Sequence, residues 1–405
     1  MKKRWAVVGV MAWAMLWPAE GWTSGYAQNV QGASSAGVAG AVTGRPNLPE
    51  AGYYNPAGWV LQGDMGAAVG GSFILPFIDH EDPNTGEETR SEVDGSTPPY
   101  LYGYGKMNNV AVGVYMGVPF GAGLKWPDDW AGRFEVTSTE LRALEVAPSV
   151  AYRPVERIAF GVGPRLVRGS VGHANRIDFA REGEEGLAEL EASAFGVGVQ
   201  AGVWAELSDS IAMGASWRSR VDLDFRGEAV FSDIPPEMEG SASDTGAETT
   251  MVLPHRWVLG LAYQLEPMGI LSLDLEYRRW GAYETFEVRF DDPDIADIEE
   301  ERGWDHTIAM RAGVEYRAPV DGLTIRSGLA IEPSPAPAET LTPAQPDADR
   351  TILSLGGGFE FSPEWRIDGA YNFMILDQNS SQGDGFEGIY DGQIHVFSLG
   401  LSGRR

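Results

Sequence analysis

The sequence predicts an all-β protein, a 14-stranded antiparallel transmembrane β-barrel, from three observations. Segments in which apolar and polar residues alternate recur along the 405-residue chain, and each is about as long as a strand that crosses a membrane. Seven long loops alternate with six short turns between these segments. The 52 Gly, 25 Pro, 13 Trp, 14 Tyr and 16 Phe residues favour many strands separated by turns over a helical bundle.

Residues 1–24 are expected to form a secretory signal peptide that is removed from the mature protein. A basic cluster, Lys2 to Arg4, precedes an apolar stretch from Trp5 to Trp17 that is too short to span a bilayer comfortably. Cleavage is expected between residues 21 and 27, because small residues near Gly21 and at Ala27 both suit the signal peptidase. No later stretch offers about 18 consecutive apolar residues, so the sequence excludes a helical membrane protein.

The alternation defines each predicted strand and its two faces. In the predicted strand 270–283, Leu271, Leu273 and Leu275 fall on one face, whereas Asp274 and Glu276 fall on the other. One face suits lipid and the other suits water. Because lipid offers no hydrogen bonds to the backbone, the sheet must close on itself. The fourteen predicted strands cover residues 64–76, 98–106, 109–118, 140–153, 158–170, 192–207, 211–231, 249–265, 270–283, 304–318, 323–331, 350–361, 365–376 and 393–402.

A soluble β-sandwich is the alternative all-β fold, since its strands also alternate. Its loops would not sort strictly into long and short ones, so the barrel is favoured. The short turns should face the periplasm and the long loops the outside, and an even strand count brings both ends of the barrel to the periplasmic side. Aromatic residues near strand ends are expected to form the interfacial girdles: Tyr100, Tyr152, Trp217, Trp257, Trp280 and Trp365.

Composition and charge exclude several classes of function. The net charge of -28 at pH 7 argues against a nucleic-acid partner, whose phosphates would be repelled. Acidic runs at 79–94, 182–191 and 291–301 favour a solvated loop surface over a cation site. The absence of Cys excludes disulfides and thiolate metal sites.

A catalytic function is not expected. None of the 5 His residues forms a metal-spaced pair, no Gly-x-Ser-x-Gly motif occurs, and no Gly-rich phosphate loop is followed by Lys. Two of these residues, His80 and His173, are expected in solvated loops. The sequence therefore predicts no catalytic residue, no metal site and no cofactor.

Residues 25–63 precede the barrel, which is expected to comprise residues 64–405. They are rich in Gly, Ala and Ser and do not have the pattern of a spanning strand. The lumen of a 14-stranded barrel is wide enough that it must be water-filled or plugged, so this segment is predicted to form an N-terminal hatch inside the lumen. Composition alone favours an ordinary turn for Asn55-Pro56-Ala57-Gly58 within it.

A series of short motifs runs along the chain in a defined order. It comprises Gly25-Tyr26, Gln31 to Gly37, Asn55-Pro56-Ala57-Gly58, Pro119-Phe120-Gly121, Asp129 to Arg133, Pro148 to Tyr152, Leu253-Pro254 and Asp349-Arg350. Together, over nearly the whole mature chain, they resemble the FadL family of outer-membrane long-chain fatty-acid transporters, which also includes toluene and hydrocarbon channels. One departure is the end, Leu399 to Arg405, where such barrels usually carry an aromatic residue that the barrel-assembly machinery reads.

The resemblance implies an outer-membrane channel of a Gram-negative cell for passive, ligand-gated uptake. A long-chain fatty acid or other hydrophobic small molecule would be captured at extracellular loops, the hatch would rearrange, and the ligand would leave sideways near the third strand. The other expected partners are outer-membrane lipid, lipopolysaccharide and the barrel-assembly machinery, and a monomer is expected. An unselective porin is the alternative; it fits the barrel but not the hatch.

The resemblance also implies site residues in three regions. The hatch gate would comprise Asn55, Pro56, Ala57 and Gly58, and the lateral opening Gly113, Gly117, Pro119 and Phe120. The capture loops, 171–191 and 226–248, would contribute Leu187 and Leu190, which have a helix-like spacing, and Phe231, Ile234 and Met238. Routine barrel glycines and ordinary loop packing are the alternatives. A ligand carboxylate could bind Arg168, Arg220, Arg278 or Arg311, although luminal arginines more often pair with Asp and Glu.

Overall fold

The structure, a computed structural model, describes residues 25–405 except 47, 94, 182–183, 237–242, 266, 294 and 383–385. The predicted signal peptide, residues 1–24, and Met238 lie outside the described residues. Among the described residues, no helix is long and apolar enough to cross a membrane.

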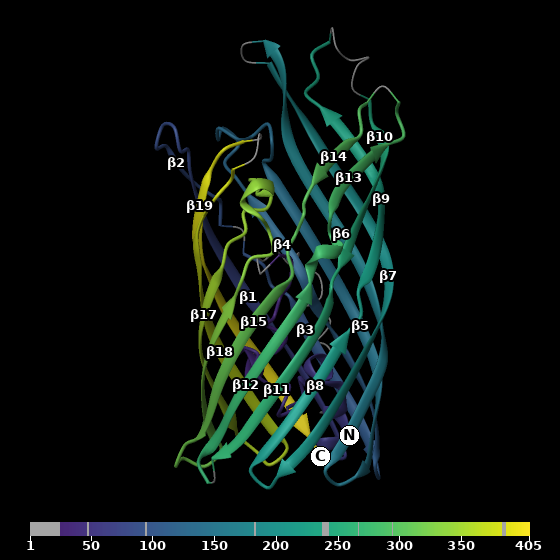
Figure 1. Cartoon of the computed structure of the whole chain (residues 1–405), viewed down its shortest axis with the longest axis vertical. Coiled ribbons are helices and arrows are strands. Elements are labelled where there is room, and N and C mark those ends of the chain that lie inside the picture. Colours follow the sequence, from purple (N-terminus) through teal and green to yellow (C-terminus); the bar gives the residue numbers. More distant parts are fainter. Residues whose placement is uncertain are drawn as a thin grey trace, which may run out of the picture.

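A closed antiparallel barrel of 14 strands forms the wall, as predicted (Figure 1). Pairing of β1 with β19, from Gly66↔Arg404 to Glu81↔Ile389, closes it. Two wall strands are interrupted, so β8 continues as β9 and β10 as β11, while β2, β13 and β14 extend the loops. The strands are β1 (Met65–Glu81), β2 (Glu88–Arg90), β3 (Pro99–Met107), β4 (Val110–Lys125), β5 (Ser138–Val155), β6 (Ile158–Arg181), β7 (Glu184–Ser208), β8 (Ile211–Arg218), β9 (Val221–Ser232), β10 (Thr245–Leu253), β11 (His255–Leu265), β12 (Gly269–Arg279), β13 (Thr285–Phe290), β14 (Ile298–Glu301), β15 (Thr307–Arg317), β16 (Leu323–Glu332), β17 (Arg350–Glu360), β18 (Trp365–Ser380) and β19 (Ile389–Arg404).

The two faces of the wall follow the predicted alternation. In β12, Leu273 and Leu275 are 46% and 45% exposed on the outer surface, whereas Asp274, Glu276 and Arg278 are buried. The outer surface is therefore apolar and suits lipid, and the polar side chains of the same strand point into the lumen.

The predicted loops 171–191 and 226–248 are largely strands, which corrects the sequence interpretation. β6 and β7 pair up to Arg181↔Glu184, with one register shift between Asp178 and Arg181, and this hairpin rises at the end of the barrel that carries the long loops (Figure 1). Leu187 and Leu190 lie in β7, so the helix-like spacing was misleading. The reason is that these strand ends carry acidic residues and Gly on both faces, which hides the period-two pattern.

The girdle prediction is wrong for two of its six residues. Tyr152, Trp257 and Trp365 are exposed on the outer face, but Tyr100 and Trp280 are buried. The Tyr100 hydroxyl accepts a hydrogen bond from the backbone N–H of Ala33 at 3.0 Å, so this ring packs against the luminal segment and not against lipid. Position near a strand end thus did not distinguish the two faces.

The described residues between 25 and 63 lie inside the barrel, where they contact several wall strands (purple in Figure 1). They form α2 (Ala33–Ala36), α3 (Ala51–Tyr54) and the 3-10 helix η1 (Pro56–Leu61). α2 contacts β17, β18 and β19, and η1 contacts β5, β6 and β7. The wall glycine Gly161 lets η1 approach closely, because a Cβ there would lie 2.4 Å from the backbone nitrogen of Ala57.

Buried ion pairs in the lumen connect side chains of different wall strands. Glu145 lies 2.8 Å from Arg165 and also pairs with Arg218, and all three side chains are buried. Arg326 pairs with both Glu315 and Asp368 at 2.7 Å. Such pairs hold the interior because loss of one partner would leave a buried charge uncompensated.

The four candidate arginines divide into two groups. Arg278 pairs with Glu276, and Arg311 lies 2.5 Å from Glu332, so these luminal guanidiniums have acidic partners as the alternative interpretation held. Arg168 and Arg220 are exposed. They do not line the lumen, which makes them unsuitable as luminal carboxylate ligands.

We predict that Glu145→Ala will destabilise the folded barrel by about 3–5 kcal/mol, because two buried guanidiniums lose their carboxylate. Urea unfolding of the purified protein in detergent micelles measures the change. Glu248→Ala is the matched control, since its ion pair with Arg226 is exposed, and it should leave the midpoint close to the parent value. Equal midpoints for both variants would contradict the structural role of the Glu145 cluster.

Candidate functional site

The wall is irregular in the extracellular half of β4. The register between β4 and β5 shifts between Gly117 and Phe120, which marks a bulge. Pairing of β4 with β3 ends at Met116, opposite Leu101. Every residue from 117 to 124 is buried, whereas buried and more exposed residues alternate in the first half of the strand. β4 therefore leaves the regular wall at this point, and its β3 side is open to another partner.

The start of the luminal segment is that partner. The backbone N–H of Gln28 donates to the carbonyl of Pro119 at 2.8 Å, and the N–H of Gly121 donates to the carbonyl of Tyr26 at 2.8 Å. Ala27 faces Phe120 between these two bonds in an isolated antiparallel bridge. Tyr26 to Gln28 thus act as a short strand that pairs with β4 where β3 no longer does.

The Gln31 side chain fixes the same segment a few residues further on. Its Nε2 donates to the carbonyl of Val118 at 2.9 Å, and its Oε1 accepts from the Tyr115 hydroxyl at 2.5 Å. The backbone carbonyl of Gln31 accepts from the Tyr102 hydroxyl at 2.5 Å. Sequence reasoning gave Gln31 no role, although the residue falls in a motif that carried the family resemblance.

The predicted opening residues separate into two positions. Gly117, Pro119 and Phe120 lie at the bulge. Gly113 lies below it and pairs on both sides, with Tyr104 and with Ser149. A Cβ at Gly113 would lie 2.4 Å from the Trp59 ring, so this glycine makes room for the luminal segment. The role of these residues in ligand exit stays a prediction.

Asn55 connects the luminal segment to the wall. Its Oδ1 accepts from the N–H of Ala57 at 3.2 Å and caps η1, while its Nδ2 donates to the carbonyls of Thr43 at 3.2 Å and Val203 at 3.0 Å. Pro56 and Gly58 follow in η1, and both are buried. Composition favoured an ordinary turn here, and the structure has a capped 3-10 helix. The gating role of these four residues stays a prediction.

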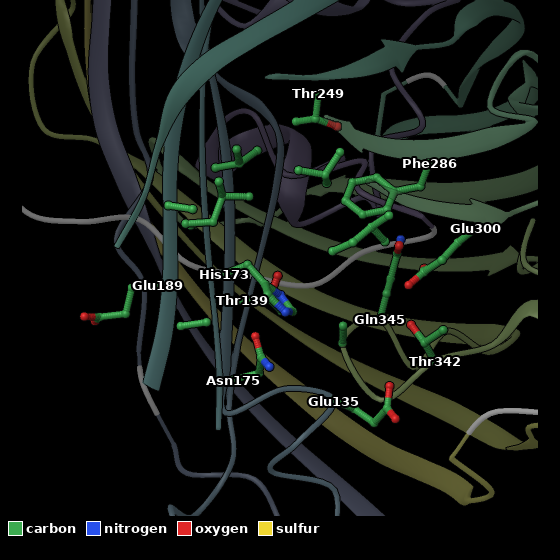
Figure 2. A pocket seen from close by; sticks show the side chains of 18 of the residues that line it. Glu135, Thr139, His173, Asn175, Glu189, Thr249, Phe286, Glu300, Thr342 and Gln345 are labelled. Atoms are coloured by element: carbon green, nitrogen blue, oxygen red, sulfur yellow. The ribbon is translucent and has the colours of Figure 1, made fainter. Parts of the chain in front are cut away.

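A cavity of about 760 Å³ opens in the extracellular half of the barrel (Figure 2). This volume lies within the usual range for small-molecule sites. Residues of β5, β6, β7, β9, β10, β13 and β14 line it, together with the loop residues 342–345. Its phenylalanines supply most of the aromatic surface: Phe134, Phe179, Phe225, Phe231, Phe286 and Phe290.

Tyr26 joins this cavity to the bulge of β4. Its side chain lines the cavity, and its ring stacks on Trp304 with a centroid separation of 5.4 Å. Its hydroxyl donates to Oε1 of Gln345 at 2.5 Å, and burial raises the pKa of Tyr26 well above its usual range, so the group is a neutral donor. The backbone of the same residue pairs with Gly121. One short segment therefore touches both the cavity and the irregular wall strand.

The predicted capture residues are only partly together. Leu190 and Phe231 line the cavity. Leu187 pairs in β7 with Arg176 and Ser232 and does not line it. Ile234 lies near Gly186, at the end of the long hairpin. The pattern of the sequence missed most of the lining because it is assembled from many strands.

The two histidines expected in solvated loops lie in strands instead. His173 lies in β6 and lines the cavity. His80 lies in β1, is 2% exposed and packs among rings that include Trp130 at 5.6 Å and Phe386 at 5.2 Å. Within the described part of the chain, no cluster of three or more His, Cys, Asp or Glu side chains could hold a metal ion.

These features define an outer-membrane β-barrel with an apolar extracellular cavity and a luminal segment beside an irregular wall strand. Residues 19–402 match the family model described as "Outer membrane protein transport protein (OMPP1/FadL/TodX)", so the chain belongs to this family. The predicted family, its outer-membrane location and its class of transport proteins, not enzymes, are thereby confirmed.

Known proteins resemble the chain in sequence and in fold. A protein of Salmonella typhi named "Long-chain fatty acid transport protein" is 25% identical over 282 residues, and the match covers 63% of this chain and 64% of that relative. The crystal structure of a Pseudomonas aeruginosa FadL homologue superposes with a TM-score of 0.83 at 18% identity, covering 94% of this chain and 99% of the other. The P. putida toluene transporter TodX gives a TM-score of 0.77 at 17% identity, with coverage of 96% and 99%.

We predict that Asn55→Ala will loosen the luminal segment, because the backbone carbonyls of Thr43 and Val203 and the N–H of Ala57 lose a buried partner, at a cost of about 1–3 kcal/mol. Hydrogen exchange of amides in residues 51–61 should speed up while the wall strands stay protected. Asn84→Ala is the control, since Asn84 is exposed and its amide contacts Glu387. Unchanged exchange in the Asn55 variant would contradict the anchoring role.

Proposed function

We propose that this protein is a channel for the passive, ligand-gated uptake of hydrophobic small molecules across the outer membrane. The observation that carries the proposal is the double contact of Tyr26 to Gln28. This segment lines the cavity through Tyr26 and pairs with Pro119 and Gly121 at the bulge of β4. A molecule in the cavity would therefore touch the element that fills the irregular part of the wall.

Capture would take place in the extracellular cavity. Its aromatic lining offers an apolar surface, and each methylene that a ligand buries there contributes about 0.8 kcal/mol. The charged, hydrated lipopolysaccharide layer hinders direct entry of an apolar molecule into the outer leaflet. The names of similar proteins mention long-chain fatty acids and toluene, and both are hydrophobic small molecules.

Release would follow displacement of the N-terminal segment. Two backbone hydrogen bonds to β4, the contacts of Gln31, and the side-chain bonds of Tyr26 to Gln345 and of Asn29 to Glu332 hold this segment. None of these contacts belongs to the pairing between wall strands. The hatch rearrangement would open the β3 side of β4 at Gly117 to Phe120, and the ligand would leave sideways into the membrane. The concentration gradient and consumption inside the cell supply the driving force.

An unselective porin is the weaker candidate. It would need a water-filled lumen, whereas residues 25–63 fill part of the lumen here and Asn55 and Trp59 are fully buried within it. Planar-bilayer recordings separate the two functions, because a porin gives a large steady ion current and the proposed channel gives little current with saturable ligand binding.

We predict that a disulfide between Ala27→Cys and Phe120→Cys will stop uptake while it is oxidised and restore it on reduction. The two residues face each other as a non-hydrogen-bonded pair, in which Cα atoms are about 4.5 Å apart, a spacing that a disulfide accepts. The natural chain has no Cys, so the bond is unique. Uptake of a radiolabelled hydrophobic compound by cells, with and without a reductant, measures the effect.

A second double variant, Ser72→Cys with Ser398→Cys, is the matched control. These residues pair in β1 and β19 with their hydroxyl oxygens 2.8 Å apart, so a disulfide there joins strands that should never separate. Uptake should be the same in its oxidised and reduced states. Equal uptake by the oxidised and reduced Ala27 and Phe120 variant would overturn the gating step.

A further inference from the structure

The charged groups around the cavity are unequally distributed. Arg302 is the one Arg or Lys among the described lining residues, and its side chain is buried. Five acidic residues also line the cavity: Glu135, Glu140, Asp178, Glu189 and Glu300. Figure 2 labels Glu135, Glu189 and Glu300 among them. The apolar site is therefore bordered by more negative than positive charge.

Arg302 is already neutralised by a protein carboxylate. Its Nη2 lies 2.8 Å from Oε2 of Glu300, and its Nη1 donates to the Thr342 hydroxyl at 3.4 Å. The guanidinium also lies over the Phe286 ring, 5.3 Å from its centroid. A fatty-acid carboxylate that approached this guanidinium would have to displace Glu300 or sit beside it, and either arrangement carries an electrostatic cost.

One donor of Arg302 has no partner. Nε is buried and makes no hydrogen bond among the described residues. A buried donor without an acceptor is unfavourable, so a ligand that brings an acceptor oxygen gains by satisfying it. A hydroxyl, ether or carbonyl oxygen can accept this bond without adding a negative charge beside Glu300.

Another cation beside the cavity lining is similarly engaged. Arg133, which adjoins the lining residue Phe134, lies 2.6 Å from Glu185 and donates to both oxygens of that carboxylate. The nearest carboxylate of Arg133 is therefore Glu185, which does not line the cavity.

From this arrangement we infer that the cavity selects uncharged hydrophobic molecules that carry a hydrogen-bond acceptor over carboxylate anions of the same length. The inference rests on the proposed function, because it concerns the ligand class of the same cavity. Glu300 is the residue that sets the selectivity, since it occupies the guanidinium that an anion would need.

A matched ligand pair tests the inference. Dodecanol and dodecanoate have the same chain, and at pH 8 only the second carries a charge. Equilibrium dialysis measures the binding of each ligand to the purified full-length protein, which an amphipathic polymer keeps in solution. Each ligand is used below the concentration at which it aggregates. The parent protein is expected to bind dodecanol more tightly. Glu300→Gln, which leaves Arg302 charged and unpaired, should shift the affinity ratio toward dodecanoate by about tenfold.

Glu299→Gln is the control variant. It removes one charge from the same strand, but Glu299 does not line the cavity, so the ratio should stay at the parent value. The two ligands differ in how readily they enter the polymer. Comparing the affinity ratio of dodecanol to dodecanoate between variants cancels this difference, because the polymer is the same in every sample.

The outcomes separate this inference from the function on which it rests. Binding of neither ligand would overturn the proposed function and the inference with it. Saturable binding in which the parent prefers dodecanoate would overturn the inference alone. An equal shift in Glu300→Gln and Glu299→Gln, or no shift in either, would remove Glu300 as the selecting residue.

Discussion

The backbone of a membrane-spanning sheet must find all its hydrogen bonds within the protein, and this constraint governs the whole structure. Closure of β1 on β19 meets it for most of the wall. The exception is the extracellular half of β4, where pairing with β3 ends and Tyr26 to Gln28 take over. A segment of the luminal chain thus pairs in place of a wall strand, and the pairing of the wall strands with one another does not depend on it.

Buried ion pairs hold the rest of the lumen in place. Buried clusters around Glu145, Glu276 and Arg326 bind the strands to one another, and Arg45 of the luminal segment lies 3.1 Å from Glu315. Such networks are costly to break in a desolvated interior. In the proposed mechanism, the binding free energy of the ligand breaks a few contacts of Tyr26 to Gln31. The ion pairs hold the rest of the luminal segment in place.

The sequence predicts the barrel well because lipid on one face and water on the other impose a period of two, which Leu273 and Asp274 follow directly. That signal fails where the strands pass beyond the membrane: Leu187 and Leu190 suggested a helix, although their spacing of three places them on opposite faces of β7. Single-residue roles were less predictable. Tyr100 and Gly113 are explained by contacts with Ala33 and Trp59, and no local pattern encodes such long-range contacts. The cavity escaped prediction for the same reason, since it combines residues of many strands.

The central claim is that the N-terminal segment leaves β4 when a ligand binds. Amide hydrogen exchange measures this directly, because the N–H groups of Gln28 and Gly121 make the two bonds that would break. Both amides should be protected in the ligand-free protein and exchange much faster when a hydrophobic ligand saturates the cavity, while amides of β1 and β19 stay protected. Equal protection of Gln28 and Gly121 in the free and saturated protein would contradict the account.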